Sequence, residues 1–242
     1  MLIALQSHSF GADNQKCYVL KNYFTIFIRN ILRRKFFASI NILGLTAALT
    51  ACFLIALYVI DEFSYDRFHV NAGRIYQVGV HRKFGVQDVR TTTTCAPMAP
   101  VLMSEIPEVE SVLRLTDGGK PVFRYGEKVF SEDKVFVTDS NFFQFFSFKL
   151  ISGNAETALT EPNTVVLTEQ VALKYFGHEN PLEKLIIIGE GEDKITYKVT
   201  GVAADCPSNS HLDFNVLMSA EPFGYFQVDA WLNGGIYNYF LL

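Results

Sequence analysis

The longest apolar stretch of the chain runs from Phe36 to Ile60, 25 residues without a charged side chain. Charged residues are scattered through the rest of the sequence, and two of them, Asp61 and Glu62, end the stretch. As an α-helix, the 21 residues 40–60 would measure about 30 Å, which is the thickness of the hydrocarbon core of a bilayer. Buried helices of soluble proteins are usually shorter, so the pattern predicts a transmembrane helix.

The segment before this stretch, residues 19–39, has a helical period. Polar residues fill one face, and apolar residues recur on the other at Leu20, Tyr23, Phe24, Phe27, Ile28, Ile31, Leu32 and Phe36. An amphipathic helix with a basic face is typical of a membrane surface, although a helix that packs on a protein core has the same period. We therefore expect four basic residues at a membrane interface: Arg29, Arg33, Arg34 and Lys35.

Residues 1–18 form an extension that is unlike the sequence after it. The apolar start MLIAL has no basic residue before it, and the long apolar stretch begins too far along the chain for a typical cleaved signal peptide. We hypothesise that the extension is an upstream mis-start and that the native chain begins at Val19. Finding Met1 or Leu2 at the native N-terminus would contradict this hypothesis.

Residues 61–242 combine strand and helix patterns, which predicts an α+β fold with one mixed domain after the membrane helix. The expected strands are 74–80, 88–94, 128–139, 163–167, 184–190 and 194–205. We expect the first two strands to pair through the turn FGVQ, and the last two to pair through the turn Gly-Glu-Gly-Glu-Asp.

Three helices are expected in the same domain. The first covers residues 97–106, and the third begins after Thr168 as N-cap and ends at Gly177. The second begins at Asp139 as N-cap and is expected to bury four aromatic rings: Phe142, Phe143, Phe145 and Phe146.

The net charge of −4 is unevenly distributed along the chain. Residues 1–39 contain six Lys or Arg and one acid, a net charge of +5, which leaves −9 for the remainder. Basic residues favour the cytoplasmic side of a membrane helix, so we expect the N-terminus in the cytoplasm and residues 61–242 outside the membrane. The acidic outer domain has no basic stripe, which argues against nucleic-acid binding.

Three small residues, Gly44, Ala48 and Cys52, are spaced four apart within the apolar stretch. Small residues on one helix face let a second helix approach closely, although Gly and Ala are also common in membrane helices in general. The packing interpretation requires a partner helix from elsewhere, because no later run in the sequence reaches 18 apolar residues.

Motifs for catalysis and cofactor binding are missing from the sequence. The Gly118-Gly119-Lys120 sequence lacks the upstream Gly and the following Ser or Thr of a Walker A loop, and neither GxSxG nor HExxH occurs. The five histidines have no metal-ligand spacing. Ser210, His211 and Asp213 are close in sequence, but a turn or capping cluster is the expected interpretation. We therefore expect no enzymatic activity, no cofactor and no metal.

The four cysteines form no CxxC motif. Cys95 and Cys206 both belong to the outer domain, where a disulfide is permitted. Two free, partly buried thiols are the alternative.

Several blocks resemble the MacB/FtsX-like ABC transporter permeases, over roughly residues 19–242. They occur in the family's order and spacing, and the main ones are LKNYFTIFIRNILRRKFFASINILGL, YVIDEFSYDRFH, NAGRIYQV, VFVTDSNFFQFFSFKLISGNAETAL, EPNTVVLTEQVALKYFG and YKVTGVAADCPSNSHLDFNVLMS. The resemblance implies a MacB-like periplasmic core domain at residues 61–242, in a permease of the cell inner membrane.

The resemblance also implies how such a protein works. Permeases of this family have a separate cytoplasmic ABC ATPase, which fits the missing Walker A loop, and ATP-driven movement of their membrane helices is transmitted to the periplasmic domain. It implies a homo- or heterodimer of permeases and a periplasmic or outer-membrane protein partner. Family permeases have further spans after this domain, so we expect the chain to be a fragment.

The junction between the membrane helix and the outer domain is where we expect mechanical coupling. Its candidate residues are Asp61, Glu62, Tyr65 and Asp66. Anchoring of the helix end at the membrane interface is a simpler role for them and is compatible with coupling. A single-pass, membrane-anchored binding or sensor module is the alternative function for the whole chain.

Overall fold

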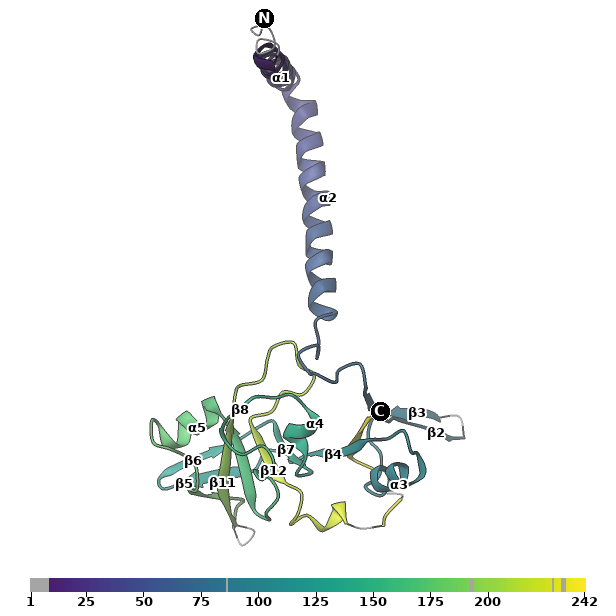
Figure 1. Cartoon of the computed structure of the whole chain (residues 1–242), viewed down its shortest axis with the longest axis vertical. Coiled ribbons are helices and arrows are strands. Elements are labelled where there is room, and N and C mark those ends of the chain that lie inside the picture. The colour runs from purple at the N-terminus through teal and green to yellow at the C-terminus, as the bar shows by residue number, and fades with distance from the viewer. Residues whose placement is uncertain (1–8, 86, 192–193, 228, 232–233) are drawn as a thin grey trace, which may run out of the picture. The chain divides into compact units, whose positions relative to one another are not determined.

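The computed structural model describes residues 9–85, 87–191, 194–227, 229–231 and 234–242, and it separates the chain into two compact units (Figure 1). The first unit ends at Phe63, and the second, the outer domain, comprises Ser64–Leu242.

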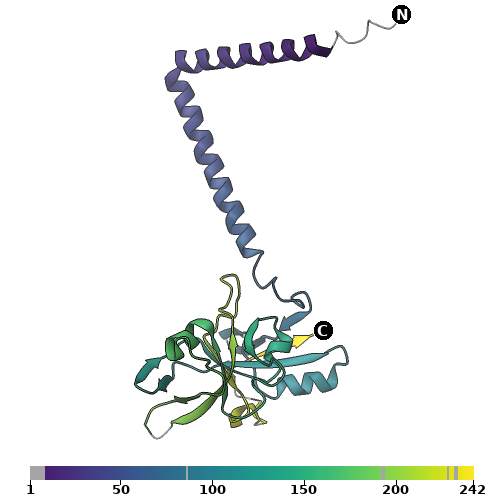
Figure 2. The ribbon, with the colours of Figure 1, turned by 60° about the vertical axis from the view of Figure 1, so that its left-hand side comes forward.

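The first unit consists of two helices, α1 (Ser9–Arg33) and α2 (Lys35–Glu62). Figure 2 shows the interruption between them, where Arg34 leaves the helical region at φ −122° and ψ 52°. The amphipathic segment expected at 19–39 therefore ends at Arg33, and residues 35–39 belong to the apolar helix. At its other end, α1 continues back to Ser9 without a break at the edge of the 1–18 extension; residues 1–8 lie outside the described residues.

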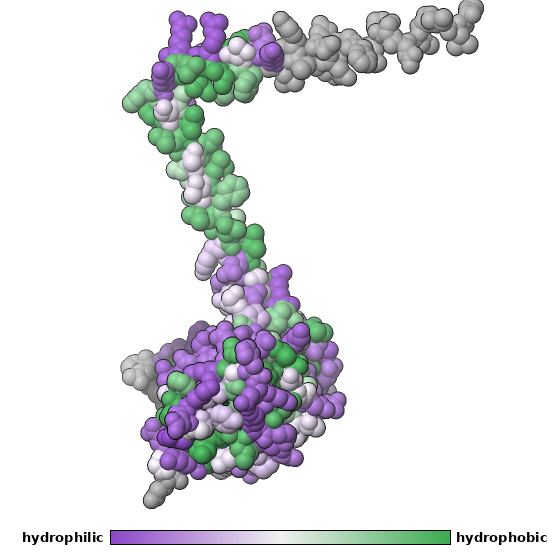
Figure 3. Space-filling model, turned by 90° about the vertical axis from the view of Figure 1, so that its left-hand side faces the viewer, coloured by the Kyte–Doolittle hydropathy of each residue, from purple (hydrophilic) through white to green (hydrophobic). Residues whose placement is uncertain are grey.

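Helix α2 is long and apolar enough to cross a membrane, and none of its 28 residues is buried within the chain. Figure 3 shows hydrophobic side chains along its surface, and polar and apolar side chains on opposite sides of the coloured part of α1. Apolar surface of this kind is stable only against lipid or other apolar helices, so the exposure agrees with the predicted membrane helix.

The outer domain is built on an 11-stranded mixed sheet. The strand order is β1-β13-β4-β7-β12-β9-β11-β10-β5-β6, and β8 pairs with β11 beside β10. Two pairs of adjacent strands are parallel, namely β7 with β12 and β9 with β11. The other pairs of this sheet are antiparallel. The strands are β1 (Ile75–Gln77), β4 (Ser111–Asp117), β5 (Val122–Tyr125), β6 (Lys128–Ser131), β7 (Val135–Thr138), β8 (Leu150–Gly153), β9 (Thr164–Thr168), β10 (Leu185–Ile188), β11 (Ile195–Ala203), β12 (Val216–Ser219) and β13 (Ile236–Leu241).

The remaining elements lie around this sheet. A separate two-stranded sheet pairs β2 (Val80–Phe84) with β3 (Gln87–Thr91). The helical elements are α3 (Met98–Glu105), α4 (Phe142–Phe145), α5 (Glu169–Phe176) and the 3-10 helix η1 (Gly224–Phe226).

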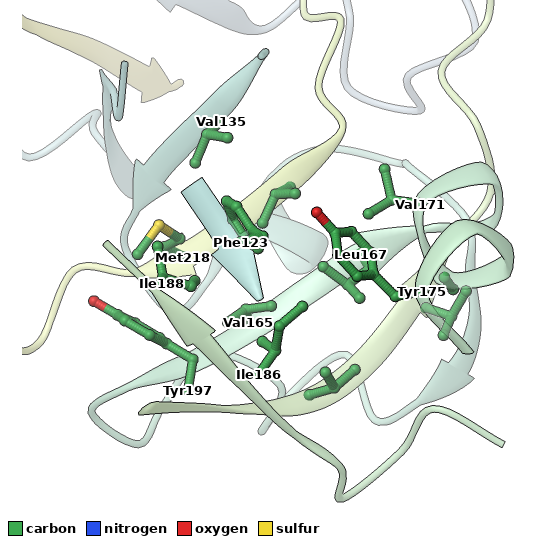
Figure 4. Packing of buried hydrophobic residues seen from close by; sticks show 14 of the residues in the cluster. Phe123, Val135, Val165, Leu167, Val171, Tyr175, Ile186, Ile188, Tyr197 and Met218 are labelled. Atoms are coloured by element: carbon green, nitrogen blue, oxygen red, sulfur yellow. The ribbon is translucent and has the colours of Figure 1, made fainter. Parts of the chain in front are cut away.

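Both faces of the central strands are buried. Along β9, Val165 and Leu167 belong to one hydrophobic cluster, while Val166 between them belongs to another. Alternate side chains of a strand point to opposite faces, so a strand that is covered on both sides reads as the continuous apolar run TVVL. Helix α5 contributes Val171 and Tyr175 to the first cluster (Figure 4).

The second cluster contains the phenylalanines that the sequence predicted to be buried. Phe142, Phe143, Phe145 and Phe146 are all at most 9% exposed; Phe148 stacks on Phe142, and Phe214 meets Phe142 edge-on. The expected α+β fold is confirmed, and the expected helix at 97–106 corresponds to α3. The hairpin expected at 184–205 is confirmed as β10 and β11.

Two local expectations were wrong, and a third was confirmed in position only. The first hairpin pairs β2 with β3. The segment 74–80, which was expected to be its first strand, lies partly in β1, and β1 pairs with β13 in the main sheet. Asp139 is not the cap of α4, because its carboxylate pairs with Arg114 instead. Thr168 stands at the N-cap position of α5 but makes no side-chain capping bond, whereas Gly177 ends the helix at φ 62° as expected.

Candidate functional site

The segment that enters the outer domain is tied to it by several side chains. We call residues 64–70 the docked segment, and the loop that receives it is the 206–211 loop. Asn209 donates from Nδ2 to the carbonyl oxygen of Ser64 at 3.1 Å and to its Oγ at 3.2 Å. In the reverse direction, the backbone N–H of Asp66 donates to the carbonyl oxygen of Asn209 at 2.9 Å. The segment and the loop therefore hold each other through both backbone and side chains.

Asp66 is at the centre of this contact. Its Oδ1 accepts from the backbone N–H of His211 at 3.0 Å, and Oδ2 lies 2.7 Å from Nδ1 of the same residue. Ser210 adds a longer bond from Oγ to Oδ1, at 3.4 Å. The backbone of Asp66 has φ +58°, in the left-handed region that aspartate tolerates better than most residues. This conformation occurs where the carboxylate makes its contacts with the loop.

His69 fixes the end of the docked segment against residues 146–148. Its side chain is 4% exposed, and the backbone N–H of Ser147 donates to Nδ1 at 3.1 Å. The hydroxyl of Ser147 accepts from the backbone N–H of Val70 at 2.9 Å. Phe68, Phe146 and Phe148 surround the imidazole, with ring centroids 4.0 to 5.1 Å away.

Burial in this aromatic environment lowers the pKa of His69. The nearby Asp66 carboxylate raises the pKa and His211 lowers it, but both effects are smaller than that of burial. The geometry agrees with a neutral ring, because a nitrogen that accepts a hydrogen bond carries no proton. The proton of the neutral ring is then on Nε2, which is buried without a hydrogen-bond partner in the described structure.

The sequence cluster Ser210-His211-Leu212-Asp213 is a turn and not a catalytic triad. Ser210 donates from Oγ to the carbonyl oxygen of Leu212, and Asp213 pairs with Lys134 at 2.6 Å. His211 faces Asp66 and, through Nε2, the hydroxyl of Tyr239 at 3.2 Å. The expected turn role is thereby confirmed, with a contact to the docked segment that the sequence did not reveal.

The structure brings together only part of the predicted coupling junction. Asp66 is in the contact, and Tyr65 is 43% exposed beside it. Asp61 and Glu62 are the last residues of α2, in the other unit. The sequence did not reveal that Asp66 bonds to the 206–211 loop or that His69 bonds to Ser147, because the partners are far apart in the chain.

The predicted membrane-facing residues are exposed. The basic residues Arg29, Arg33, Arg34 and Lys35 lie at the end of α1 and the start of α2. Gly44, Ala48 and Cys52 lie on α2, and an added Cβ at Gly44 would meet no atom within 4 Å.

A second feature of the outer domain is a cavity of about 310 Å³ beside Arg114 and Asp139. The two side chains form a bidentate ion pair, with bonds of 3.0 Å and 2.9 Å, and Arg114 also donates to the carbonyl oxygen of Phe226 at 2.7 Å. Because these charges satisfy each other, the pair fixes η1 to β4 and offers no free charge to a ligand.

The described residues contain no group of three or more His, Cys, Asp or Glu that could hold a metal ion. Cys95 and Cys206 are both free, which decides between the two expectations for this pair. Burial raises the pKa of Cys206 to about 11, so its thiol is unreactive near neutral pH.

A family model described as the MacB-like periplasmic core domain matches residues 38–240. No curated protein matches the chain in sequence.

Three solved structures are similar to the outer domain. A domain of a protein described as a permease, from Porphyromonas gingivalis, is 24% identical with a TM-score of 0.62, over 70% of this chain and 73% of that one. The periplasmic region of MacB from Actinobacillus actinomycetemcomitans is 20% identical with a TM-score of 0.47, over 69% and 72%. The extracellular domain of the ABC-type transporter YknZ from Gram-positive bacteria is 13% identical with a TM-score of 0.48, over 69% and 81%. The first of these structures is similar enough to support the assignment of the fold, and it supports nothing beyond the fold. The other two, with their lower TM-scores, support no conclusion.

Proposed function

Because the chain belongs to the family of MacB-like periplasmic core domains, we propose that it is a permease subunit of an ABC transporter of the MacB/FtsX type. In this proposal, a partner hydrolyses ATP in the cytoplasm, and the outer domain changes conformation to export or extract a substrate. The family assignment itself confirms the resemblance found in the sequence. The domain is that of ABC-transporter permease-type proteins and is not itself an ATPase.

The proposed topology rests on α2 and its flanking charges. A helix of 28 residues with no buried side chain would cross the inner membrane, and the basic residues before it would keep the N-terminus in the cytoplasm. The amphipathic helix α1 would lie along the cytoplasmic face of the bilayer, where its arginines meet lipid headgroups. The outer domain would then lie in the periplasm.

The observation that carries the coupling proposal is the attachment of the docked segment. Asp66 and His69 fix this segment to two separate parts of the outer domain, only a few residues after α2 ends. A connection with many bonds transmits displacement, whereas a flexible linker would absorb it. We therefore assign the coupling role to Asp66 and His69 together with the 206–211 loop, with Asp61, Glu62 and Tyr65 at its membrane end.

The proposed partners rest on the family and on the surface of α2. We propose a cytoplasmic ABC ATPase near α1, a second permease whose helix packs on the face of Gly44, Ala48 and Cys52, and a periplasmic or outer-membrane protein that contacts the outer domain. Close helix packing at small residues is the physical basis for the second of these.

Purification from native membranes tests the proposal. The tagged protein should retain an ABC ATPase in stoichiometric amount, and the complex should hydrolyse ATP. Isolation without any ATPase, under conditions that preserve membrane complexes, would contradict the proposal and favour a membrane-anchored binding or sensor module.

A further inference from the structure

The docked segment depends on a histidine that must be neutral. The bond from the backbone N–H of Ser147 to Nδ1 of His69, 3.1 Å long, exists only while that nitrogen is unprotonated. Adding a proton to Nδ1 would break this bond, leave a backbone N–H of Ser147 without an acceptor and place a positive charge in a site that is 4% exposed.

The environment of His69 opposes such a charge on most sides. Residues 146–148 contribute two aromatic rings and Ser147, and none of these carries a charge. The titratable groups that face the ring are Asp66, from its own segment, and His211, from the 206–211 loop. The Asp66 carboxylate bonds to the backbone N–H and the ring of His211, whereas its contact with His69 is a backbone bond from the His69 N–H to the Asp66 carbonyl oxygen.

We propose that protonation of His69 releases the docked segment from residues 146–148, so that mildly acidic pH loosens the attachment of the segment that follows α2. The release is a property of the outer domain alone. Its consequence, weaker coupling between membrane helix and periplasmic domain, rests on the proposed function.

The direction of the pH effect follows from linkage. His69 has a lowered pKa when docked, so the docked state binds fewer protons than the released state, in which the imidazole has its ordinary value of 6.5. Docking is therefore strongest above pH 6.5 and weakens as the pH falls from there toward the lowered pKa.

Hydrogen exchange of the full chain in lipid nanodiscs tests this proposal. Rates are corrected for the intrinsic pH dependence of exchange, and the relevant amides are those of Asp66, Val70 and Ser147, which are hydrogen-bonded in the docked state. We expect their protection to fall about fivefold or more between pH 7.5 and pH 5.5, since one buried hydrogen bond is lost. Protection that does not change with pH would overturn the proposal.

Two variants identify the histidine responsible. His69→Asn keeps an acceptor close to the position of Nδ1 but cannot be protonated, so protection should stay high at both pH values. His211→Gln removes the other imidazole near the ring, and the fall in protection at low pH should persist. A pH response in His69→Asn equal to that of the native chain would also overturn the proposal.

A measurement on the native chain keeps the test independent of how well these variants fold. Exchange of the imidazole Cε1 hydrogen, followed by mass spectrometry of peptides, gives the titration of His69 directly. A ring that titrates at or above 6.5 would contradict the proposal. That result would not affect the proposed binding of an ABC ATPase, so the experiment distinguishes this proposal from the proposed function.

Discussion

At the scale of single residues, the structure assigns the attachment of the outer domain to a few polar side chains. Asp66 accepts hydrogen bonds from two residues of the 206–211 loop while its backbone adopts a left-handed conformation. Both features are explained by an aspartate, because this residue tolerates positive φ and carries two acceptor oxygens. The sequence could single out Asp66 only from its place after the apolar stretch, and it contained no signal for the partners more than 140 residues away.

The first prediction concerns Asp66 itself. Asp66→Ala removes the acceptors of the His211 N–H and also strains the backbone, so local opening of the docked segment should become easier by about 1–3 kcal/mol. Asp66→Asn keeps a side-chain oxygen and tolerates positive φ, so it should lower the free energy of local opening by less than half of that amount. The free energy of local opening is measured by hydrogen exchange at residues 64–70. Equal values for both variants would show that the carboxylate contacts do not hold the segment.

At the scale of helices and strands, the sequence predicted elements whose pattern is local. The apolar run of β9 identified a strand, the turn between β10 and β11 identified a hairpin, and Gly177 identified the end of α5. The strands β4, β5, β8, β12 and β13 were missed, and three of these, β5, β8 and β12, are only four residues long. The pairing of Asp139 with Arg114, 25 residues away, could not be predicted either, since a local N-cap explained the same aspartate equally well.

The pairing of β8 with β11 supplies the second prediction. Gly153 has φ +101°, and an added Cβ would lie 2.4 Å from the carbonyl oxygen of Thr200. Gly153→Ala should therefore destabilise the outer domain by about 2–4 kcal/mol, through both strain and steric overlap. Gly119→Ala is the matched control, because Gly119 also has positive φ, at +74°, but open space around it.

Urea unfolding of the full chain in detergent measures this difference. Gly119→Ala should lower the free energy of unfolding by only about 1 kcal/mol, because only the backbone strain contributes. Equal losses in the two variants would show that β8 does not approach β11 as closely as described.

The third prediction concerns α2. Gly44→Leu should disrupt packing of a partner helix, whereas Thr50→Leu, on the opposite face of the helix, should leave it intact. Cross-linking in native membranes reports this association, and we expect the cross-linked species to fall severalfold for Gly44→Leu only. Unchanged cross-linking in Gly44→Leu would remove the small-residue face from the proposed interface.

At the scale of the whole molecule, two very different surfaces occur in one chain. The helix α2 exposes apolar side chains throughout, while the outer domain buries most of its described phenylalanines around a sheet. Composition and hydropathy predicted this division, because length and charge mark a membrane helix clearly. The strand order could not be predicted in the same way, since it depends on contacts between distant segments and no local signal encodes it.

The central claim is that movement of the membrane helices, driven by ATP, reaches the outer domain through the docked segment. Hydrogen exchange of the purified complex with its ATPase, with and without a non-hydrolysable ATP analogue, tests it most directly. We predict that the analogue changes protection in residues 64–70, 146–148 and 206–211, and that Asp66→Ala abolishes the change beyond the segment while the ATPase stays bound. Identical protection in both nucleotide states, with the analogue bound, would contradict the account.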